Sequence, residues 1–126
     1  MSEPVKPGTI GWVDLTVGDA PVLRDFYARV AGWTPQPVSM GEYDDYTMMH
    51  PETGTPVAGV CHRRGPNEPL PPVWMIYIVV AGLEAALNEV EAAGGTVVKR
   101  PSKTGPGAMA IIQDPCGVYS ALYQAT

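Results

Sequence analysis

Asp14 is the carboxylate of this 126-residue chain whose surroundings most favour a chemical role. It lies in a β-type run at residues 9–17, in which apolar residues at the odd positions from 13 to 17 alternate with the others. Because successive side chains of a strand point to opposite faces, Asp14 shares its face with Trp12 and Thr16. A carboxylate on an apolar and aromatic face has to be paired, hydrated or functional. Two interpretations stay open: a structural hydrogen bond to a neighbouring strand, or a catalytic acid or base.

Histidine and cysteine supply the other groups that could bind a metal or attack a substrate. His50 precedes a proline in a predicted hairpin turn and His62 ends a predicted strand, and lone histidines without a partner at ligand spacing are usually structural or solvated. Cys61 is adjacent to His62, but neighbours in a strand face opposite sides, so we expect no Cys–His pair. Cys61 and Cys116 are expected to be free thiols.

Composition and motifs exclude several classes of function. The formal net charge of −5 argues against a nucleic-acid partner, because such binding relies on clustered Lys and Arg. No stretch approaches the roughly 20 apolar residues that span a bilayer, and no signal peptide is recognisable, so we expect no membrane partner and a cytoplasmic location. The chain has no GxSxG or P-loop motif, and Gly105-Pro106-Gly107 precedes a strand, which is typical of a hairpin turn.

The elements that must position these residues can be located from hydrophobic periodicity. We expect Asp19 to cap a helix that has Pro21 in its first turn and that ends at Gly32. The apolar residues of this helix fall on one face, which is predicted to be buried. They are Val22, Leu23, Phe26, Tyr27 and Val30. Three further strands are predicted near residues 33–38, 43–49 and 56–62.

The same order of elements recurs after a proline-rich connection at residues 63–72. A strand is predicted at residues 73–80, a helix at 83–93, and strands near 96–100, 108–113 and 118–123. Trp12 corresponds to Met75 and Gly32 to Gly95, at a nearly constant shift of about 63 residues. We therefore predict one domain, residues 1–126, built from two βαβββ modules at about 8–62 and 73–125. Gly32 and Gly95 are both predicted to end a helix with a positive φ.

Four motifs follow one another in an order and spacing that belong together. They are the strand-to-helix entry at residues 13–19, the passage from Phe26-Tyr27 to Gly32-Trp33, Gly94-Gly95-Thr96, and Asp114-Pro115-Cys116-Gly117. In these motifs the chain resembles, over about residues 8–125, the vicinal oxygen chelate superfamily of glyoxalases, bleomycin resistance proteins and extradiol dioxygenases. The resemblance implies an α+β fold in which two βαβββ modules form a cup-shaped curved sheet with the helices on the outside.

The resemblance also locates four inward positions at which metal-dependent members of the superfamily carry His or Glu. In this chain they are Trp12, Gly59, Met75 and Ala121. None of these side chains offers the oxygen or imidazole donor that a divalent metal in such an enzyme requires. We therefore expect no metal at the family site and no cofactor.

In the strand at residues 73–80, alternation sends Ile76, Ile78 and Val80 toward the helix and leaves Met75, Tyr77 and Val79 on the open face. Strand parity and the resemblance together give the candidate ligand-binding residues. They are Trp12, Asp14, Gly59, Met75, Tyr77, Tyr119, Ala121 and Tyr123. The aromatic members suit a planar or hydrophobic small molecule, and the resemblance to bleomycin resistance proteins implies a metal-free homodimer that sequesters its ligand. The alternative is an enzyme of the glyoxalase-type lyase, isomerase or dioxygenase kind, with displaced metal ligands or with Asp14 as its acid or base. An interaction or regulatory module is the third possibility.

Overall fold

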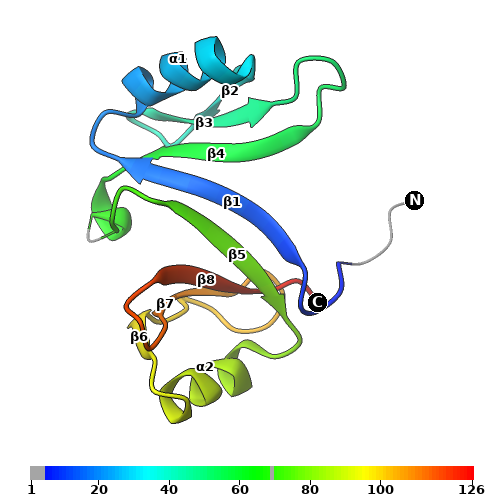
Figure 1. Ribbon diagram of the computed structural model, residues 1–126, viewed down its shortest axis with the longest axis vertical. Helices are drawn as coiled ribbons and strands as arrows, with labels where there is room; N and C mark the ends of the chain where they lie inside the picture. Colours follow the sequence, from blue (N-terminus) through cyan, green and yellow to red (C-terminus); the bar gives the residue numbers. More distant parts are fainter. Residues whose placement is uncertain (1–4, 69) are drawn as a thin grey trace. The chain divides into compact units, whose positions relative to one another are not determined.

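The computed structural model describes residues 5–68 and 70–126. In these residues eight strands and two α-helices follow the predicted order, strand, helix and three strands, twice along the chain (Figure 1). The predicted α+β class and the two βαβββ repeats are confirmed. The chain forms two compact units, Val13–Trp74 and residues 5–12 together with Met75–Thr126.

The unit of Val13–Trp74 holds most of the first repeat. Its strands β1 (Ile10–Val17), β2 (Thr34–Ser39), β3 (Asp44–Met49) and β4 (Pro56–His62) are joined in the order β2-β3-β4-β1. β1 and β4 are parallel, and the other neighbours are antiparallel. Helix α1 (Ala20–Ala31) covers one face of these strands, where Met48 and Val60 are fully buried. A 3₁₀ turn, η1 (Gly65–Asn67), lies in the connection to the second repeat.

Both ends of α1 are set by residues that the sequence identifies. The Asp19 side chain accepts a hydrogen bond from the backbone N–H of Val22 at 3.3 Å, and Pro21 lies in the first turn. Gly32 ends the helix with φ 75°, in the left-handed region that only glycine enters without a steric cost. The predicted start and end of this helix are confirmed.

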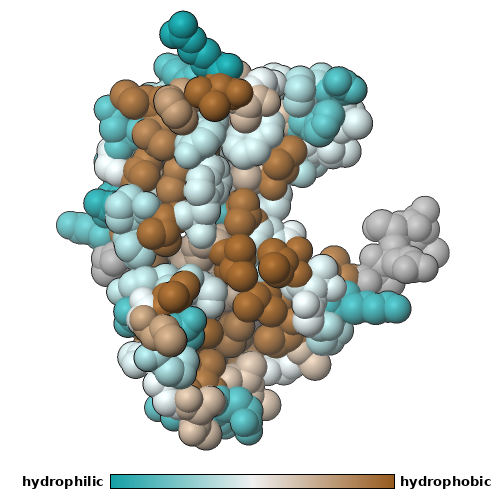
Figure 2. All heavy atoms as spheres, in the orientation of Figure 1, coloured by the Kyte–Doolittle hydropathy of each residue, from teal (hydrophilic) through white to brown (hydrophobic). Residues whose placement is uncertain are grey.

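The prediction that one broad apolar face of α1 is buried is wrong for three of its five residues. Leu23 and Tyr27 pack against the core beneath the helix. Val22, Phe26 and Val30 are 57%, 51% and 65% exposed. The two groups lie on neighbouring stripes of the helix, and the strands are in contact with only one of them. Figure 2 shows apolar surface over α1 that this exposure produces.

The second unit repeats the arrangement with β5 (Trp74–Val80), β6 (Thr96–Lys99), β7 (Met109–Gln113) and β8 (Tyr119–Gln124). Its strands are joined in the order β5-β8-β7-β6, and β5 and β8 are parallel. Helix α2 (Leu83–Ala92) covers a core in which Leu83, Leu87 and Ala110 are buried. The side chain of Gln124 accepts a hydrogen bond from the Leu83 N–H at 2.8 Å and so caps the start of α2 from the last strand.

The prediction that Gly95 ends α2 with a positive φ is wrong, because Gly94 takes that conformation with φ 91°. Gly95 is required for a different reason. A Cβ on Gly95 would lie 2.8 Å from the backbone oxygen of Gln113 and 2.9 Å from Val90 Cγ1. The chain therefore passes too close to β7 and α2 at this point for any side chain.

The boundaries of the two compact units differ from those of the two predicted modules. Residues 5–12 belong with β5 to β8, where the Gly8 N–H donates to the Val79 carbonyl at 2.7 Å and the Val79 N–H donates to the Thr9 carbonyl at 2.8 Å. The first strand of the first repeat thus contributes its beginning to the second unit. In the described residues, no helix is long and apolar enough to cross a bilayer; the expected cytoplasmic location stays a prediction.

Candidate functional site

A pocket of ≈ 450 Å³ opens on the unit that contains β5 to β8. Its walls come from residues 5–12, from β5 and β8, and from the chain entering β7. The lining residues are Val5, Gly11, Trp12, Tyr77, Val79, Gly107, Met109 and Tyr123. None of them carries a formal charge, and three are aromatic. The volume lies in the range of about 300–1,000 Å³ that is usual for small-molecule sites.

Strand register explains why these side chains meet. Val79 lies opposite Tyr123, and Tyr123 lies opposite Met109, so the three side chains point to one face of the sheet. Tyr77 is two residues from Val79 on the same strand and therefore shares that face. The intervening Ile78 packs instead against the core beneath α2. The parity that the sequence predicts for β5 is confirmed.

Three of the eight candidate ligand-binding residues, Trp12, Tyr77 and Tyr123, come together in this pocket. Gly11, directly before Trp12, allows the close approach of the chain here, since a Cβ on it would lie 3.1 Å from Val79 Cγ2. Trp12 and Tyr123 come from sequence positions more than a hundred residues apart. The fold of this unit therefore builds an aromatic surface that neither repeat contains alone.

The other five candidates do not line the pocket. Met75 and Ala121 share the unit but are 1% and 0% exposed. Tyr119 lies at the start of β8, opposite Gln113. The remaining two, Asp14 and Gly59, belong to the unit of Val13–Trp74, where they are directly opposed across β1 and β4.

A group of polar side chains surrounds the end of β4 in the unit of Val13–Trp74. Asp45, which is 8% exposed, accepts a hydrogen bond from the backbone N–H of His62 at 2.9 Å and lies 3.3 Å from the Nδ1 atom of that residue. The Asp45 carboxylate also accepts a hydrogen bond from the Cys61 thiol. The imidazole of His62 packs edge-on against Tyr43, with 5.1 Å between ring centroids. Asp45 thus forms hydrogen bonds with both Cys61 and His62, the last two residues of β4.

This environment determines the chemistry of Cys61. Burial, together with the nearby carboxylates of Asp14 and Asp45, raises the pKa of the Cys61 thiol to about 12. A thiol with this pKa is neutral near pH 7, and the neutral form is a poor nucleophile. His62 is engaged by the Asp45 carboxylate. The arrangement does not suit nucleophilic catalysis by Cys61.

The remaining titratable residues considered in the sequence stabilise turns. His50 accepts the backbone N–H of Glu52 through Nδ1 at 3.1 Å. Asp114 accepts the N–H groups of Cys116 and Val118 at 2.9 Å and 3.0 Å. These hydrogen bonds explain why a histidine and an aspartate occupy positions 50 and 114, with no need for either to bind a ligand.

The residues present do not fit the metal of the resembled superfamily. At the four positions that the resemblance assigns to metal ligands, the indole N–H of Trp12 is a hydrogen-bond donor only, and the thioether of Met75 prefers soft metals such as Cu(I). Gly59 and Ala121 have no side chain that could bind a metal. Within residues 5–68 and 70–126, no group of three or more His, Cys, Asp and Glu side chains is arranged to hold a metal ion.

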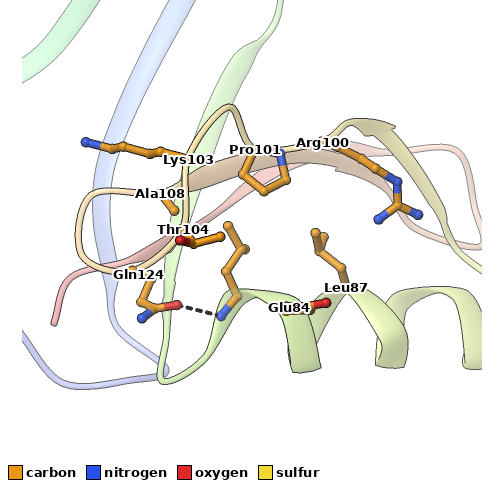
Figure 3. A pocket seen from close by; sticks show the side chains of 10 residues that line it. Glu84, Leu87, Arg100, Pro101, Lys103, Thr104, Ala108 and Gln124 are labelled. Atoms are coloured by element: carbon orange, nitrogen blue, oxygen red, sulfur yellow. Dashed lines mark hydrogen bonds between the residues drawn. The ribbon is translucent and has the colours of Figure 1, made fainter.

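A second pocket, of ≈ 310 Å³, lies between α2 and the loop of residues 100–108 in the unit that contains β5 to β8 (Figure 3). None of the candidates from the sequence lines it. Leu83 and Leu87 from the buried core are among its apolar lining residues, and the Leu83 N–H donates a hydrogen bond to the side chain of Gln124, which also lines the pocket. Lys103 lines the rim, and its side chain extends away from Leu87 (Figure 3).

Five of the eight residues that line the aromatic pocket are absent from the ligand-binding candidates, although the strand parity of residues 73–80 places one of them, Val79, on the open face. They are Val5, Gly11, Val79, Gly107 and Met109. Alternation could also have found Met109, because it lies opposite Tyr123 across paired strands and shares its face. Val5 and Gly107 come from segments without regular structure, whose positions no periodicity predicts. Asp45 was missed as well, although its alternation with the buried Tyr46 places it on the face away from α1.

The family model of the Glyoxalase/Bleomycin resistance protein/Dioxygenase superfamily matches residues 9–121. Among curated proteins, CFP32 of Mycobacterium tuberculosis, whose name assigns it provisionally to the glyoxylases, is 33% identical over 126 residues, which cover 95% of this chain and 47% of that protein. The anthracycline biosynthesis protein DnrV of Streptomyces peucetius is 31% identical over 131 residues, which cover 94% of this chain and 47% of DnrV. The chain thus spans about half the length of these curated relatives.

Solved structures show the same fold at much lower sequence identity. Methylmalonyl-CoA epimerase from Mycobacterium tuberculosis superposes with a TM-score of 0.54 at 16% identity, covering 90% of this chain and 85% of the other. The Streptomyces coelicolor epimerase gives a TM-score of 0.59 at 14% identity, with 96% of both chains covered. By its sequence match and its repeated βαβββ fold, the chain belongs to the glyoxalase, bleomycin resistance protein and dioxygenase superfamily, the vicinal oxygen chelate superfamily.

Proposed function

We propose that this chain binds a planar, hydrophobic or aromatic small molecule without a metal, in the manner of the bleomycin resistance proteins of its superfamily. The observation that carries the proposal is the pocket in which Trp12, Tyr77 and Tyr123 converge. Aromatic side chains offer large flat surfaces for stacking, and tyrosine hydroxyls add hydrogen bonds that orient a ligand. DnrV, whose name places it in the biosynthesis of anthracyclines, which are aromatic compounds, supports an aromatic ligand.

Binding of 2-naphthamide, a neutral planar probe, tests this proposal. Trp12→Ala should weaken its binding by about tenfold, because the substitution removes the largest stacking surface of the pocket. Isothermal titration calorimetry measures the affinity, and a thermal shift confirms that the variant is folded. Tyr119→Ala is the matched control, since Tyr119 is an aromatic residue of β8 outside the pocket, and it should stay within about twofold of wild type. Equal affinities of Trp12→Ala and wild type would refute the proposed site.

We also propose that the chain forms a homodimer. The stripe of Val22, Phe26 and Val30 on α1 supports an interface there, because clustered exposed apolar side chains mark interaction sites. A second copy is the partner that we favour, since the curated relatives carry about as much chain again beside the part that this chain matches. A two-fold contact would bring the same stripe together from both copies.

Introducing a charge into the stripe tests the assembly. Phe26→Glu should convert a dimer into a monomer at micromolar concentration, because it would bury a carboxylate at the centre of an apolar contact. Size-exclusion chromatography with light scattering gives the mass. Ala31→Glu adds the same charge to an exposed position on another side of α1 and should leave the dimer intact. A monomeric wild type would contradict the proposal.

A further inference from the structure

Lys103, in the loop of residues 100–108, lies close to Gly107, a residue of the same loop that lines the aromatic pocket. Its Nζ lies 2.9 Å, and its Cε 3.3 Å, from the position that a Cβ would take on Gly107. Gly107 lines the aromatic pocket, and Lys103 itself lines the rim of the second pocket. In Figure 3 the Lys103 side chain runs away from Leu87 and Pro101. The ammonium group therefore lies beside Gly107, a residue that lines the aromatic pocket, although Lys103 itself lines the second pocket and not this one.

Gly107 makes this placement possible in two ways. It has no side chain, so the lysine can pack directly on its backbone. It also has φ 86°, a conformation that other residues rarely adopt, and its N–H donates to the Gln124 carbonyl at 2.7 Å. The backbone under the ammonium group is thus fixed to β8, the strand that contributes Tyr123 to the pocket.

The charge of Lys103 is available to a ligand. No ion pair joins Lys103 to another residue in the described part of the chain, whereas Arg100 of the same loop is bonded to Glu91 at 3.0 Å. None of the eight residues that line the aromatic pocket offers a counter-charge. The chain as a whole has a net charge of −5, but charges beyond a Debye length of about 8 Å are largely screened at physiological salt, so the net charge does not by itself set the potential beside Gly107.

We infer that Lys103 determines the specificity of the aromatic pocket for aromatic carboxylates, with the ring between Trp12, Tyr77 and Tyr123 and the carboxylate at the Gly107 side. This inference rests on the proposed binding function and adds the charge of the ligand to it. Three electron-rich rings alone would also accept a cation through cation–π contact. A lysine ammonium beside Gly107, next to the residues that line the pocket, repels a cation and attracts an anion.

Three probes with the same ring separate these possibilities: 2-naphthoate, neutral 2-naphthamide and 2-naphthylmethylammonium. Wild type should bind the carboxylate about fivefold more tightly than the amide, a preference that should shrink as salt rises, and should bind the ammonium compound more weakly than both. Lys103→Gln should remove the preference for the carboxylate and leave the amide within about twofold, while Lys103→Arg, which keeps the charge, should retain it. Calorimetric titration measures all three affinities.

Lys99→Gln is the matched control. Lys99 is a lysine of the same unit that lies opposite Ile111 on the edge strand and does not line the pocket, so its loss should leave the preference unchanged. If 2-naphthoate and 2-naphthamide both bind in a Trp12-dependent way but Lys103→Gln keeps the preference, or Lys99→Gln removes it, the inference on Lys103 is wrong and the binding function stands. If no probe shows binding that depends on Trp12, the proposed function itself fails, and the inference with it.

Discussion

At pH 8, iodoacetamide should modify Cys116 at least about 100 times faster than Cys61. Cys116 is exposed in a turn, whereas Cys61 lies partly buried in β4. Burial and two carboxylates raise the pKa of Cys61 from 9.0 to about 12, so its reactive thiolate is about 1,000 times scarcer at this pH than that of a thiol with the ordinary value. Mass spectrometry of peptides taken over a time course gives the two rates.

Cys116→Ser provides the control, because it leaves Cys61 as the single thiol. This variant should react slowly when folded and rapidly in urea, where the environment of Cys61 is lost. Fast modification of Cys61 in the folded variant would show that the thiol is neither buried nor held neutral by Asp14 and Asp45.

The raised pKa of Cys61 also gives the pH dependence of stability a definite sign. Below pH 9.0 the thiol is neutral in both folded and unfolded chains and contributes no dependence. Between pH 9.0 and about 12 the unfolded chain loses the proton while the folded chain keeps it, so the free energy of unfolding falls. Urea unfolding at pH 8 and pH 10.5 should therefore show a larger loss for wild type than for Cys61→Ala.

Gly95→Ala should lower the free energy of unfolding by about 1–3 kcal/mol. The added methyl carbon would lie 2.8 Å from the Gln113 carbonyl oxygen and 2.9 Å from Val90 Cγ1. The first of these atoms belongs to the backbone of β7, so relief of the clash requires α2 and β7 to move apart over the core that they share. Urea denaturation followed by circular dichroism measures the change.

Gly18→Ala is the matched control for the same substitution. Gly18 does not have a positive φ, and a Cβ there would have no heavy atom within 4 Å. This variant should stay within about 0.5 kcal/mol of wild type. If Gly95→Ala is as stable as Gly18→Ala, the contact between the end of α2 and β7 is looser than the structure describes.

The parts of the fold that depend on local rules could be predicted from the sequence. Alternation places Tyr77 and Tyr123 on one face, and the cap of Asp19 and the left-handed Gly32 mark the ends of α1. The errors lie where neighbours outside the element decide. Whether Phe26 is buried depends on the width of the strands beneath α1, and the role of Gly95 depends on the approach of β7.

The candidate site was less predictable for the same reason. Trp12 could be assigned by parity, but Gly107 and Lys103 belong to a loop, and loop positions follow from tertiary contacts. Asp14 lies in the unit of Val13–Trp74, outside the aromatic pocket, and its carboxylate contributes there to the raised pKa of Cys61. The alternative of an enzyme that uses Asp14 stays a prediction.

The hydrogen bonds of residues 8 and 9 with Val79 limit how this chain could be divided into fragments. A cut in the connection at residues 63–72 respects the sequence repeat, yet it would leave both the N–H and the carbonyl of Val79 without the partners that Thr9 and Gly8 supply. It would also remove Trp12 from the pocket that Tyr123 lines. Complementation between separately produced halves would therefore require the first fragment to donate its leading residues to the second, as in domain-swapped proteins.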